Sequence, residues 1–374
     1  MRARLPAGKH DKKGERMRWQ AMRTAAAVAI VALAVAAAQA AAAGSAAVRV
    51  IATGLNNPRG VAVAPDGSVL VAQAGAAGKV KCFKTPEGDQ CAGFTGSIDR
   101  VANGTRTRYG AGFFSGGNRD GSFSVGMDGV TVSPGGTVYG IESTPGLHPA
   151  QFGPQVAAQA GYVLRVDRSG KSAVGDNVTA YEVKNNPAGD NLDSDPYGIA
   201  WSPLGLAVTD TAGNSLLLLG PDGRLSTLAT FGATSYGGHE AQSVPTTVVW
   251  HDGAFYVGEL GGGGTPNGQS HVWKVVPGQG KTMFATGFTT ITGLAFGSDG
   301  SMYVTELAKA GLDAAEKGKL GGALIRVWPD GQREELAAGK LIAPAGAAVG
   351  PDGTVYVSNF SVFASKGQLL AITP

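Results

Sequence analysis

The sequence predicts an all-β fold: a six-bladed β-propeller with four antiparallel strands per blade, closed into a ring by its N-terminal strand. Three observations predict it. The chain has 59 Gly among 374 residues, which favours many turns over long helices. A unit of two short strands joined by a tight turn recurs six times. The strand missing from the last unit stands at the other end of the chain.

The repeated unit predicts the first two strands of each blade. It begins with a small residue or Pro, continues through Gly and a few apolar residues to a turn such as Pro-Asp-Gly, and ends with a Val-Tyr-Val-like strand and a polar residue. The Gly of the turn supplies the positive φ that tight hairpins need. The six copies are residues 58–73, 127–142, 196–210, 245–259, 291–306 and 344–359.

A third apolar strand follows every copy, at residues 96–101, 162–166, 215–219, 271–276, 323–327 and 368–372. After the first five copies the chain turns into a fourth strand, as at 225–231, 281–288 and 333–339. Four antiparallel strands per repeat are typical of a propeller blade, whereas a linear β-solenoid would not predict repeats of such unequal length.

The sixth copy ends at Pro374, before a fourth strand can form. Residues 49–55 resemble residues 283–288, the strand that leads into the fifth copy. We therefore expect the N-terminal strand to complete the C-terminal blade, which removes the exposed edges of an open array.

The N-terminal 40 residues are typical of a secretory signal peptide, and residues 41–374 are predicted to form the single propeller domain. Eight Lys or Arg precede an apolar run at 25–38, which ends at the small-x-small site Ala38-Gln39-Ala40. The run is too short to span a membrane well. We expect a secreted, extracytoplasmic protein with no transmembrane helix in the mature chain, translated from Met1 or from Met17.

The charge balance excludes one class of partner. The whole chain has a formal net charge of +3, but residues 1–40 hold eight basic and two acidic residues, so the remainder has a net charge of −3. A chain without a basic surplus is not expected to bind nucleic acid.

The chain has two cysteines, Cys82 and Cys91. In an exported protein, a pair this close is expected to form one local disulfide. A redox or metal-binding pair is the alternative, but the spacing is not Cys-x-x-Cys.

Ligand binding is expected on one face of the ring. The turns between first and second strands are short, whereas long connections follow the second and fourth strands, for example at 143–161 and 184–197. These long connections share one face, here called the loop face, and long loops on a rigid scaffold commonly carry function. The residues that enter the first strands there are candidate ligand contacts: Arg59, Asp128, Tyr197, Thr246 and Thr292.

Six polar residues end the second strands on the same face: Gln73, Glu142, Asp210, Glu259, Glu306 and Asn359. Their carboxylate and amide oxygens suit Ca²⁺ or Mg²⁺. We expect the four acidic residues to be metal ligands at the pore, and Gln73 and Asn359 to face the ligand. The alternative is a structural role, in which each side chain hydrogen-bonds a neighbouring loop.

Candidate catalytic groups are few. His148 and His239 are the histidines in long loops, and either is a candidate general base; a solvated loop histidine is the alternative. The sequence has no Gly-x-Ser-x-Gly elbow and no phosphate-binding loop.

Several stretches go beyond the generic repeat. They include residues 82–91 followed by Thr-Gly-Ser-Ile at 95–98, residues 181–186 leading to Asp-Pro-Tyr-Gly at 195–198, and Tyr-Val-Gly-Glu-Leu at 256–260. Together with 284–288, 321–327 and 343–359, they resemble the ScyD/ScyE family, named from a gene cluster for the pigment scytonemin, over residues 48–374. This resemblance implies an exported six-bladed propeller of the NHL and gluconolactonase-like superfamily, and it implies little chemistry.

Two functions follow as hypotheses. In the first, the protein is a binding or scaffold module whose loop face holds a small molecule, a glycan or an exported protein. In the second, it is a metal-dependent lactonase or esterase resembling gluconolactonases, in which a metal held by the four carboxylates polarises the substrate carbonyl. The first is favoured because the sequence offers no convincing base; whether the protein is an enzyme stays open.

Overall fold

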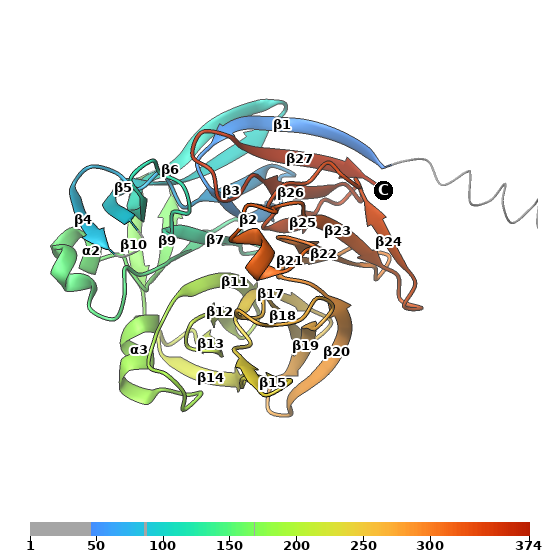
Figure 1. The fold of residues 1–374 in the computed structure, drawn as a ribbon. Helices are drawn as coiled ribbons and strands as arrows, with labels where there is room; N and C mark the ends of the chain where they lie inside the picture. Colours follow the sequence, from blue (N-terminus) through green and yellow to red (C-terminus); the bar gives the residue numbers. More distant parts are fainter. Residues whose placement is uncertain (1–45, 86–87, 168) are drawn as a thin grey trace, which may run out of the picture. The chain divides into compact units, whose positions relative to one another are not determined.

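The computed structural model describes residues 46–85, 88–167 and 169–374. The predicted signal peptide and both candidate start residues lie outside this part of the chain. Six antiparallel sheets surround one axis, and the first strand of each lies innermost (Figure 1). The prediction of a six-bladed, all-β propeller with four strands per blade is confirmed.

In blades 1 to 5 the four blade strands follow one another in chain order from the axis outward; blade 6 takes its outer strand from the N-terminus. Blade 1 comprises β2 (Pro58–Val63), β3 (Val69–Gln73), β5 (Gly88–Ala102) and β6 (Thr105–Asn118), with β4 (Lys81–Thr85) paired to the start of β5. Blade 2 comprises β7 (Met127–Val132), β8 (Val138–Glu142), β9 (Val163–Asp167) and β10 (Gly170–Val174). Blade 3 comprises β11 (Pro196–Ser202), β12 (Gly205–Asp210), β13 (Ser215–Leu219) and β14 (Leu225–Thr230).

The remaining blades repeat this order. Blade 4 comprises β17 (Pro245–His251), β18 (Ala254–Glu259), β19 (Ser270–Val276) and β20 (Gly280–Phe288). Blade 5 comprises β21 (Ile291–Phe296), β22 (Met302–Glu306), β23 (Ala323–Val327) and β24 (Arg333–Leu336). Blade 6 comprises β25 (Ala347–Val349), β26 (Val355–Asn359), β27 (Gly367–Thr373) and the N-terminal β1 (Ala47–Leu55).

The ring closes as predicted. β1 pairs antiparallel with β27, from Ala47 opposite Thr373 to Leu55 opposite Gly367. Leu55 at the end of β1 is completely buried in the core between blades 6 and 1. The N-terminal strand therefore both supplies backbone hydrogen bonds and fills the last blade-to-blade core.

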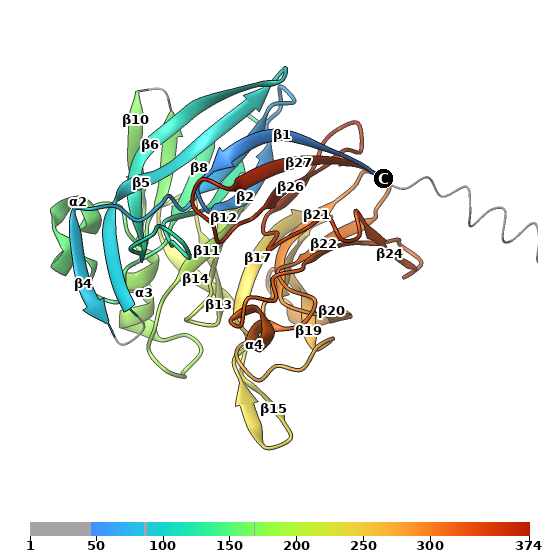
Figure 2. The ribbon, with the colours of Figure 1, turned by 45° about the horizontal axis from the view of Figure 1, so that its top comes forward.

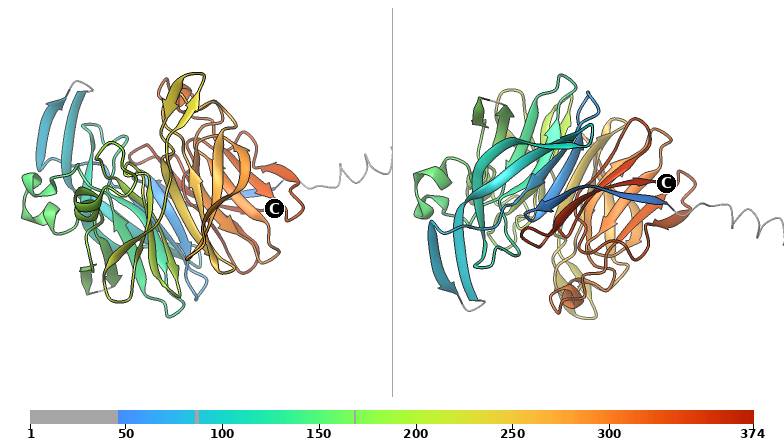
Figure 3. Two further views of the ribbon diagram at one scale, coloured as in Figure 1. Left: turned by 90° about the horizontal axis from the view of Figure 1, so that it is seen from below. Right: turned by 90° about the horizontal axis from the view of Figure 1, so that it is seen from above.

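The long connections contain structure that the repeat does not predict. They form η1 (Pro149–Phe152), α2 (Pro154–Ala157), α3 (Val178–Asn185), α4 (Leu312–Ala315), and a hairpin of β15 (Thr234–Tyr236) and β16 (His239–Ala241). Three features extend from the same side of the ring (Figures 2 and 3): the pair formed by β4 and the start of β5, here called the β4 arm, the β15–β16 hairpin, and α4. This side is the loop face.

Glycine in the inner strands lets the blades approach closely around the axis. A Cβ on Gly129 would lie 2.6 Å from the carbonyl oxygen of Tyr197 in the next blade, and one on Gly346 would lie 2.6 Å from that of Arg59. A side chain at either position would therefore push neighbouring inner strands apart.

Hydroxyl groups join neighbouring blades at the same level. The side chain just before the polar end of the second strand donates to an inner-strand carbonyl of the next blade. Thr209 bonds Thr246 O at 3.3 Å, Thr305 bonds Ala345 O, and Ser358 bonds Arg59 O at 2.6 Å. The last of these bonds crosses the ring closure between blades 6 and 1.

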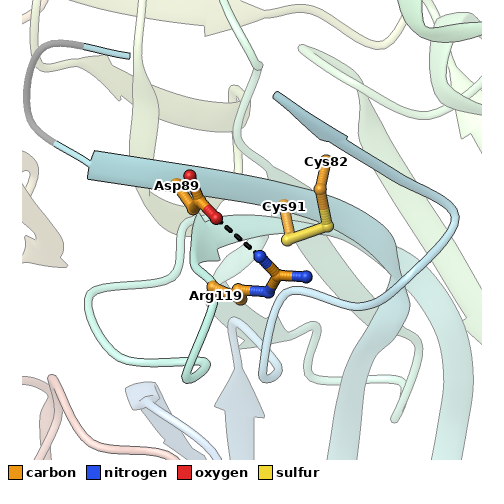
Figure 4. The surroundings of a disulfide bond; sticks show 4 residues. All are labelled: Cys82, Asp89, Cys91 and Arg119. Carbon is orange, nitrogen blue, oxygen red and sulfur yellow. Dashed lines mark hydrogen bonds and ion pairs between the residues drawn. A yellow bond between two sulfur atoms is a disulfide. The ribbon is translucent and has the colours of Figure 1, made fainter. Parts of the chain in front are cut away.

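The predicted disulfide is present between Cys82 on β4 and Cys91 on β5, at directly paired positions (Figure 4). Beside it, Arg119 Nη1 donates to Asp89 Oδ2 at 2.6 Å. Both contacts hold the β4 arm, which extends blade 1 on the loop face. Within the described residues, no helix has the length and apolar character needed to cross a membrane.

Candidate functional site

The six polar residues that end the second strands lie at the loop face, but most of their side chains turn back along their own blade. In four blades, a side-chain oxygen accepts a hydrogen bond from a backbone N–H just before the first strand of the same blade. The pairs are Gln73 with Asn56 (2.9 Å), Asp210 with Asp195 (2.7 Å), Glu306 with Thr289 (2.8 Å) and Asn359 with Ile342 (2.8 Å). These contacts fix the entry of the chain into each blade.

Glu259 is also fully engaged. Its carboxylate accepts hydrogen bonds from Ser243 Oγ and from the Trp273 indole N–H, and it lies 2.9 Å from His271 Nδ1. The residue is buried. Three polar contacts occupy its oxygens, so this carboxylate ties loop, second strand and third strand of blade 4 together.

Glu142 is the exception. The residue is completely buried, and neither carboxylate oxygen has a hydrogen-bond partner among the described residues. The two backbone N–H groups that precede the inner strand of blade 2 donate elsewhere: that of Val125 to Gly116 O at 2.8 Å and that of Gly126 to Asp128 Oδ2 at 3.4 Å. Burial, and next the charge of Asp128, raise the pKa of Glu142 well above its usual value. Glu142 is therefore protonated more readily than an exposed glutamate.

The four predicted metal ligands are not brought together. In the part of the chain that the structure describes, no three His, Cys, Asp or Glu side chains form a group able to hold a metal ion. Asp210, Glu259 and Glu306 each serve their own blade, as described above. Binding of Ca²⁺ or Mg²⁺ at the pore stays a prediction.

A cavity of about 310 Å³ runs along the propeller axis and is lined by the first strands of all six blades. Its loop-face end includes Asp128, Tyr197, Thr246 and Thr292. At the other end the lining includes His251, whose ring stacks on Phe296 at 4.2 Å between centroids. The cavity is therefore polar at the loop face and aromatic at the turn face.

Arg59 joins three blades at the polar end. Its Nε lies 3.4 Å from Asp128 Oδ1, its Nη2 donates to Ser124 O at 2.9 Å, and its guanidinium lies 5.8 Å from the centre of the Tyr197 ring. The Asp128 side chain is completely buried and that of Arg59 is 11% exposed. We call Arg59, Asp128, Glu142 and Tyr197 the axial cluster.

The electrostatics of this cluster are set mainly by burial. Burial raises the pKa of Asp128 to about 7; the Arg59 charge opposes the rise and the charge of Asp195 adds to it. Burial also raises the pKa of Tyr197. Arg59 keeps its charge because a guanidinium is not deprotonated in proteins. The cluster thus holds one fixed cation and two buried carboxyl groups whose pKa values are raised, that of Asp128 to about 7.

Asp195 supports the cluster and was not among the sequence candidates. Its Oδ1 accepts a hydrogen bond from Ser143 Oγ at 2.5 Å, and burial raises its pKa. One feature of the sequence points to Asp195: it directly precedes the Pro-Tyr-Gly start of the third repeat. Nothing in a one-dimensional pattern shows that Ser143 of blade 2 reaches it.

Thr246 and Thr292 lie at the predicted level of the channel, but their hydroxyl groups are used within the ring. Thr246 Oγ1 donates to Ile291 O at 2.7 Å, and Thr292 Oγ1 donates to Pro344 O at 3.0 Å. Each bond reaches the inner strand of the next blade. Their contribution is to fix the width of the channel.

The two candidate histidines lie apart from the cavity. His148 is exposed and immediately precedes η1. His239 is exposed on β16, with Nε2 3.2 Å from Gly263 O. Neither lines the axial cavity, so the group there with a pKa near 7 is Asp128.

Comparison with known proteins supports the fold. No protein-family model and no curated protein matches the chain. Among solved structures, a putative oxidoreductase (glucose dehydrogenase) from Thermus thermophilus has 19% identity and a TM-score of 0.53, over 88% of this chain and 100% of that one. A putative gluconolactonase has 14% identity and a TM-score of 0.52, over 88% and 92%.

A third structure, a protein of unknown function from Bacteroides thetaiotaomicron, has 11% identity and a TM-score of 0.55, over 88% of this chain and 76% of that one. At these identities the likeness shows the fold alone. The closer resemblance to the ScyD/ScyE family stays a prediction.

Proposed function

We propose that the protein binds a small hydroxylated molecule, of the size of one sugar or lactone ring, at the polar end of its axial channel. The observation that carries the proposal is the axial cluster, in which buried polar atoms lack hydrogen-bond partners. Arg59 Nε and Asp128 Oδ1 face each other in the 3.4 Å ion pair but form no hydrogen bond, and both Glu142 oxygens make no hydrogen bond to any described residue. Buried polar groups in folded proteins are nearly always satisfied, so a ligand that bonds Asp128 in the cavity would supply a missing partner.

The chemistry of the groups that line the polar end matches hydroxyl groups. Asp128 and Tyr197 line the cavity; a carboxylate accepts hydrogen bonds, and a phenol both donates and accepts them. A hydroxyl group is both donor and acceptor, so a polyhydroxylated ring can pair with both side chains. A volume of about 310 Å³ is at the small end of the range for ligand pockets.

We favour binding alone over catalysis. Hydrolysis of a lactone or ester is the second candidate function. Asp128 supports hydrolysis, because a carboxyl group with a pKa of about 7 suits a general base at neutral pH. In that version, Asp128 accepts a proton from the attacking water and then donates it to the leaving oxygen as the acyl bond breaks.

We further propose that the protein is exported. The disulfide between Cys82 and Cys91 supports this, because such bonds persist in oxidising compartments. Fractionation of expressing cells tests the location: recovery only from the cytoplasm, with free thiols at both cysteines, would contradict export.

The binding proposal is tested by thermal unfolding in the presence of monosaccharides, aldonic acids and aldonolactones. A binding compound raises the Tm of the wild-type protein, and Asp128→Asn and Tyr197→Phe remove the rise. Tyr356→Phe, on the second strand of blade 6 and outside the cavity, is the matched control and keeps it. A rise that survives in Asp128→Asn and Tyr197→Phe would place the ligand elsewhere.

The same compounds separate binding from hydrolysis. Release of acid from a lactone, followed by pH-stat titration, should occur with the wild-type protein and not with Asp128→Asn if the hydrolase version holds. A compound that raises the Tm but is recovered intact supports the binding module.

A further inference from the structure

A second set of unpartnered carboxyl groups lies outside the axial channel, where α3 packs on the loop end of blade 3. Glu182, on α3, is 0% exposed, and neither of its carboxylate oxygens has a hydrogen-bond partner in the described part of the chain. Neither Glu182 nor α3 belongs to the repeated unit, and the proposed function does not use them.

Glu182 points at Asp210, the residue that ends the second strand of blade 3. A Cβ placed on Gly213 would lie 2.9 Å from Glu182 Oε2 and 3.0 Å from Asp210 Oδ2. The two carboxylates therefore approach the same point above Gly213, one from the helix and one from the blade. Two buried carboxylates in this arrangement repel each other unless a proton or a cation lies between them.

Gly213 keeps this space open. Its φ is not in the left-handed region, so its backbone does not require glycine. Any larger residue would fill the space between the two carboxylates. A glycine at this position therefore leaves space between the two carboxylates, and the backbone conformation of the turn does not require it.

The surroundings are negative and contain no compensating side chain. Asp190 Oδ1 is a further buried oxygen without a hydrogen-bond partner, while its Oδ2 accepts from Asn214 at 2.8 Å. Asp193 lies close enough for its charge to act on Glu182. No ion pair among the described residues involves any of these four acidic groups.

We propose that Glu182 and Asp210 bind a divalent cation, Ca²⁺ by preference, in the gap above Gly213. Ca²⁺ takes six to eight oxygen ligands in flexible geometry and accepts carboxylates, carbonyls and waters together. The described residues offer two carboxylates here and no group of three acidic, histidine or cysteine ligands, so waters and neutral oxygens would complete the shell. Ser194 Oγ, which donates to Asp210 Oδ2 at 2.8 Å, lies beside this carboxylate and is a candidate further ligand.

The ion would have a defined structural effect. α3 begins at its cap Asn177, whose Oδ1 accepts from Ala180 N at 2.9 Å, and it ends at Asn186. A cation shared by Glu182 and Asp210 links the middle of this helix to the end of β12. It would therefore hold α3 on the blade and order the connection that leads to Asp195 and the axial cluster.

The test uses the full-length protein, stripped with EDTA and titrated with CaCl₂ or MgCl₂. Isothermal titration should give one Ca²⁺ per chain. Saturating Ca²⁺ should raise the Tm by roughly 3 °C or more, since a ligand at about 100 times its Kd stabilises the fold measurably. Glu182→Gln should abolish both the binding heat and the Tm rise.

Two further variants keep the result interpretable. Glu182→Met preserves the side-chain length without oxygens and should also lose the response, while circular dichroism in EDTA shows that each variant is folded. Glu306→Gln changes the equivalent strand-end residue of blade 5, and this variant should keep both the binding heat and the Tm rise with Ca²⁺. Absence of Ca²⁺ binding to the wild type would overturn the proposal. So would a response that Glu182→Gln retains, or one that Glu306→Gln removes.

Discussion

Arg59 of blade 1 and Asp128 of blade 2 meet across a blade boundary, with Nε and Oδ1 3.4 Å apart and the carboxylate completely buried. The pair is the part of the axial cluster with opposite charges. Because Asp128 has a pKa of about 7, the pair is a full ion pair only at the upper end of the physiological pH range.

The first prediction concerns pH. A carboxyl group with a raised pKa binds more protons in the folded than in the unfolded state between its two pKa values, here about 4 and about 7. The stability that protonated Asp128 contributes is complete below pH 4 and is lost as the pH rises through 7. In EDTA, the free energy of unfolding should thus fall from pH 5 to pH 8. Each unit of pKa shift corresponds to about 1.4 kcal/mol.

Asp128→Asn tests the origin of this slope by urea unfolding at both pH values. The amide stays neutral at both pH values, so the free energy of unfolding of the variant should fall less between pH 5 and pH 8 than that of the wild type. At pH 8 the variant should be about as stable as the wild type, or more stable. Asp176→Asn, a carboxyl group outside the channel, is the control. An unchanged slope in Asp128→Asn would show that Asp128 has an ordinary pKa.

The second prediction concerns Arg59. Arg59→Gln leaves Asp128 buried without its cation, so the loss of stability should be greater at pH 8, where Asp128 must ionise, than at pH 5. We expect a cost of about 3 kcal/mol at pH 8. Arg165→Gln, on the exposed side of β9, should change stability by less than about 0.5 kcal/mol. Equal losses at both pH values would mean that Arg59 acts through packing alone.

The third prediction concerns the bond across the ring closure. Ser358→Ala removes the donor to Arg59 O and also the acceptor of Gly346 N–H, at 2.9 Å. These two backbone groups keep their bond to each other, Gly346 N to Arg59 O at 3.2 Å, so we expect a loss of about 1 kcal/mol in chemical denaturation. The exposed Ser172→Ala should be neutral. A neutral Ser358→Ala would indicate that water replaces the hydroxyl group.

The fourth prediction concerns β1. Leu55→Ala creates a cavity in the core between blades 6 and 1 and should cost about 2–5 kcal/mol. Val50→Ala lies on the same strand with 48% of its surface exposed, so it should cost less than about 0.5 kcal/mol. If the two substitutions had equal effects on the Tm, β1 would contribute only its backbone pairing.

The fold could be predicted from the sequence because its determinants are local and repeated. Turn residues mark each hairpin, and the strand missing after residue 372 is supplied by residues 47–55. α3 was not predicted, although Asn177 is a good helix cap, because the helix interrupts the repeat only once.

The site could be predicted only in part. Arg59, Asp128 and Tyr197 were found because their position in the repeat places them on the axis. The difference between Glu142 and Asp210, which occupy equivalent strand ends, could not be found in the same way. It depends on where one backbone N–H points: Asp195 N donates to Asp210, whereas its counterpart Gly126 N donates to Asp128 Oδ2 at 3.4 Å.

The pairing of β1 with β27 also sets the order of folding. The last blade needs residues from both ends of the described chain, so its sheet can form only after residues 367–373 are available. Until then β1 has no partner strand, and the earlier blades form an open arc. Contacts of such long sequence separation are slow to form and favour late, all-or-none closure. A chain built in this way can remain incompletely folded while it is being made or moved, and it becomes resistant to unfolding in a single final step.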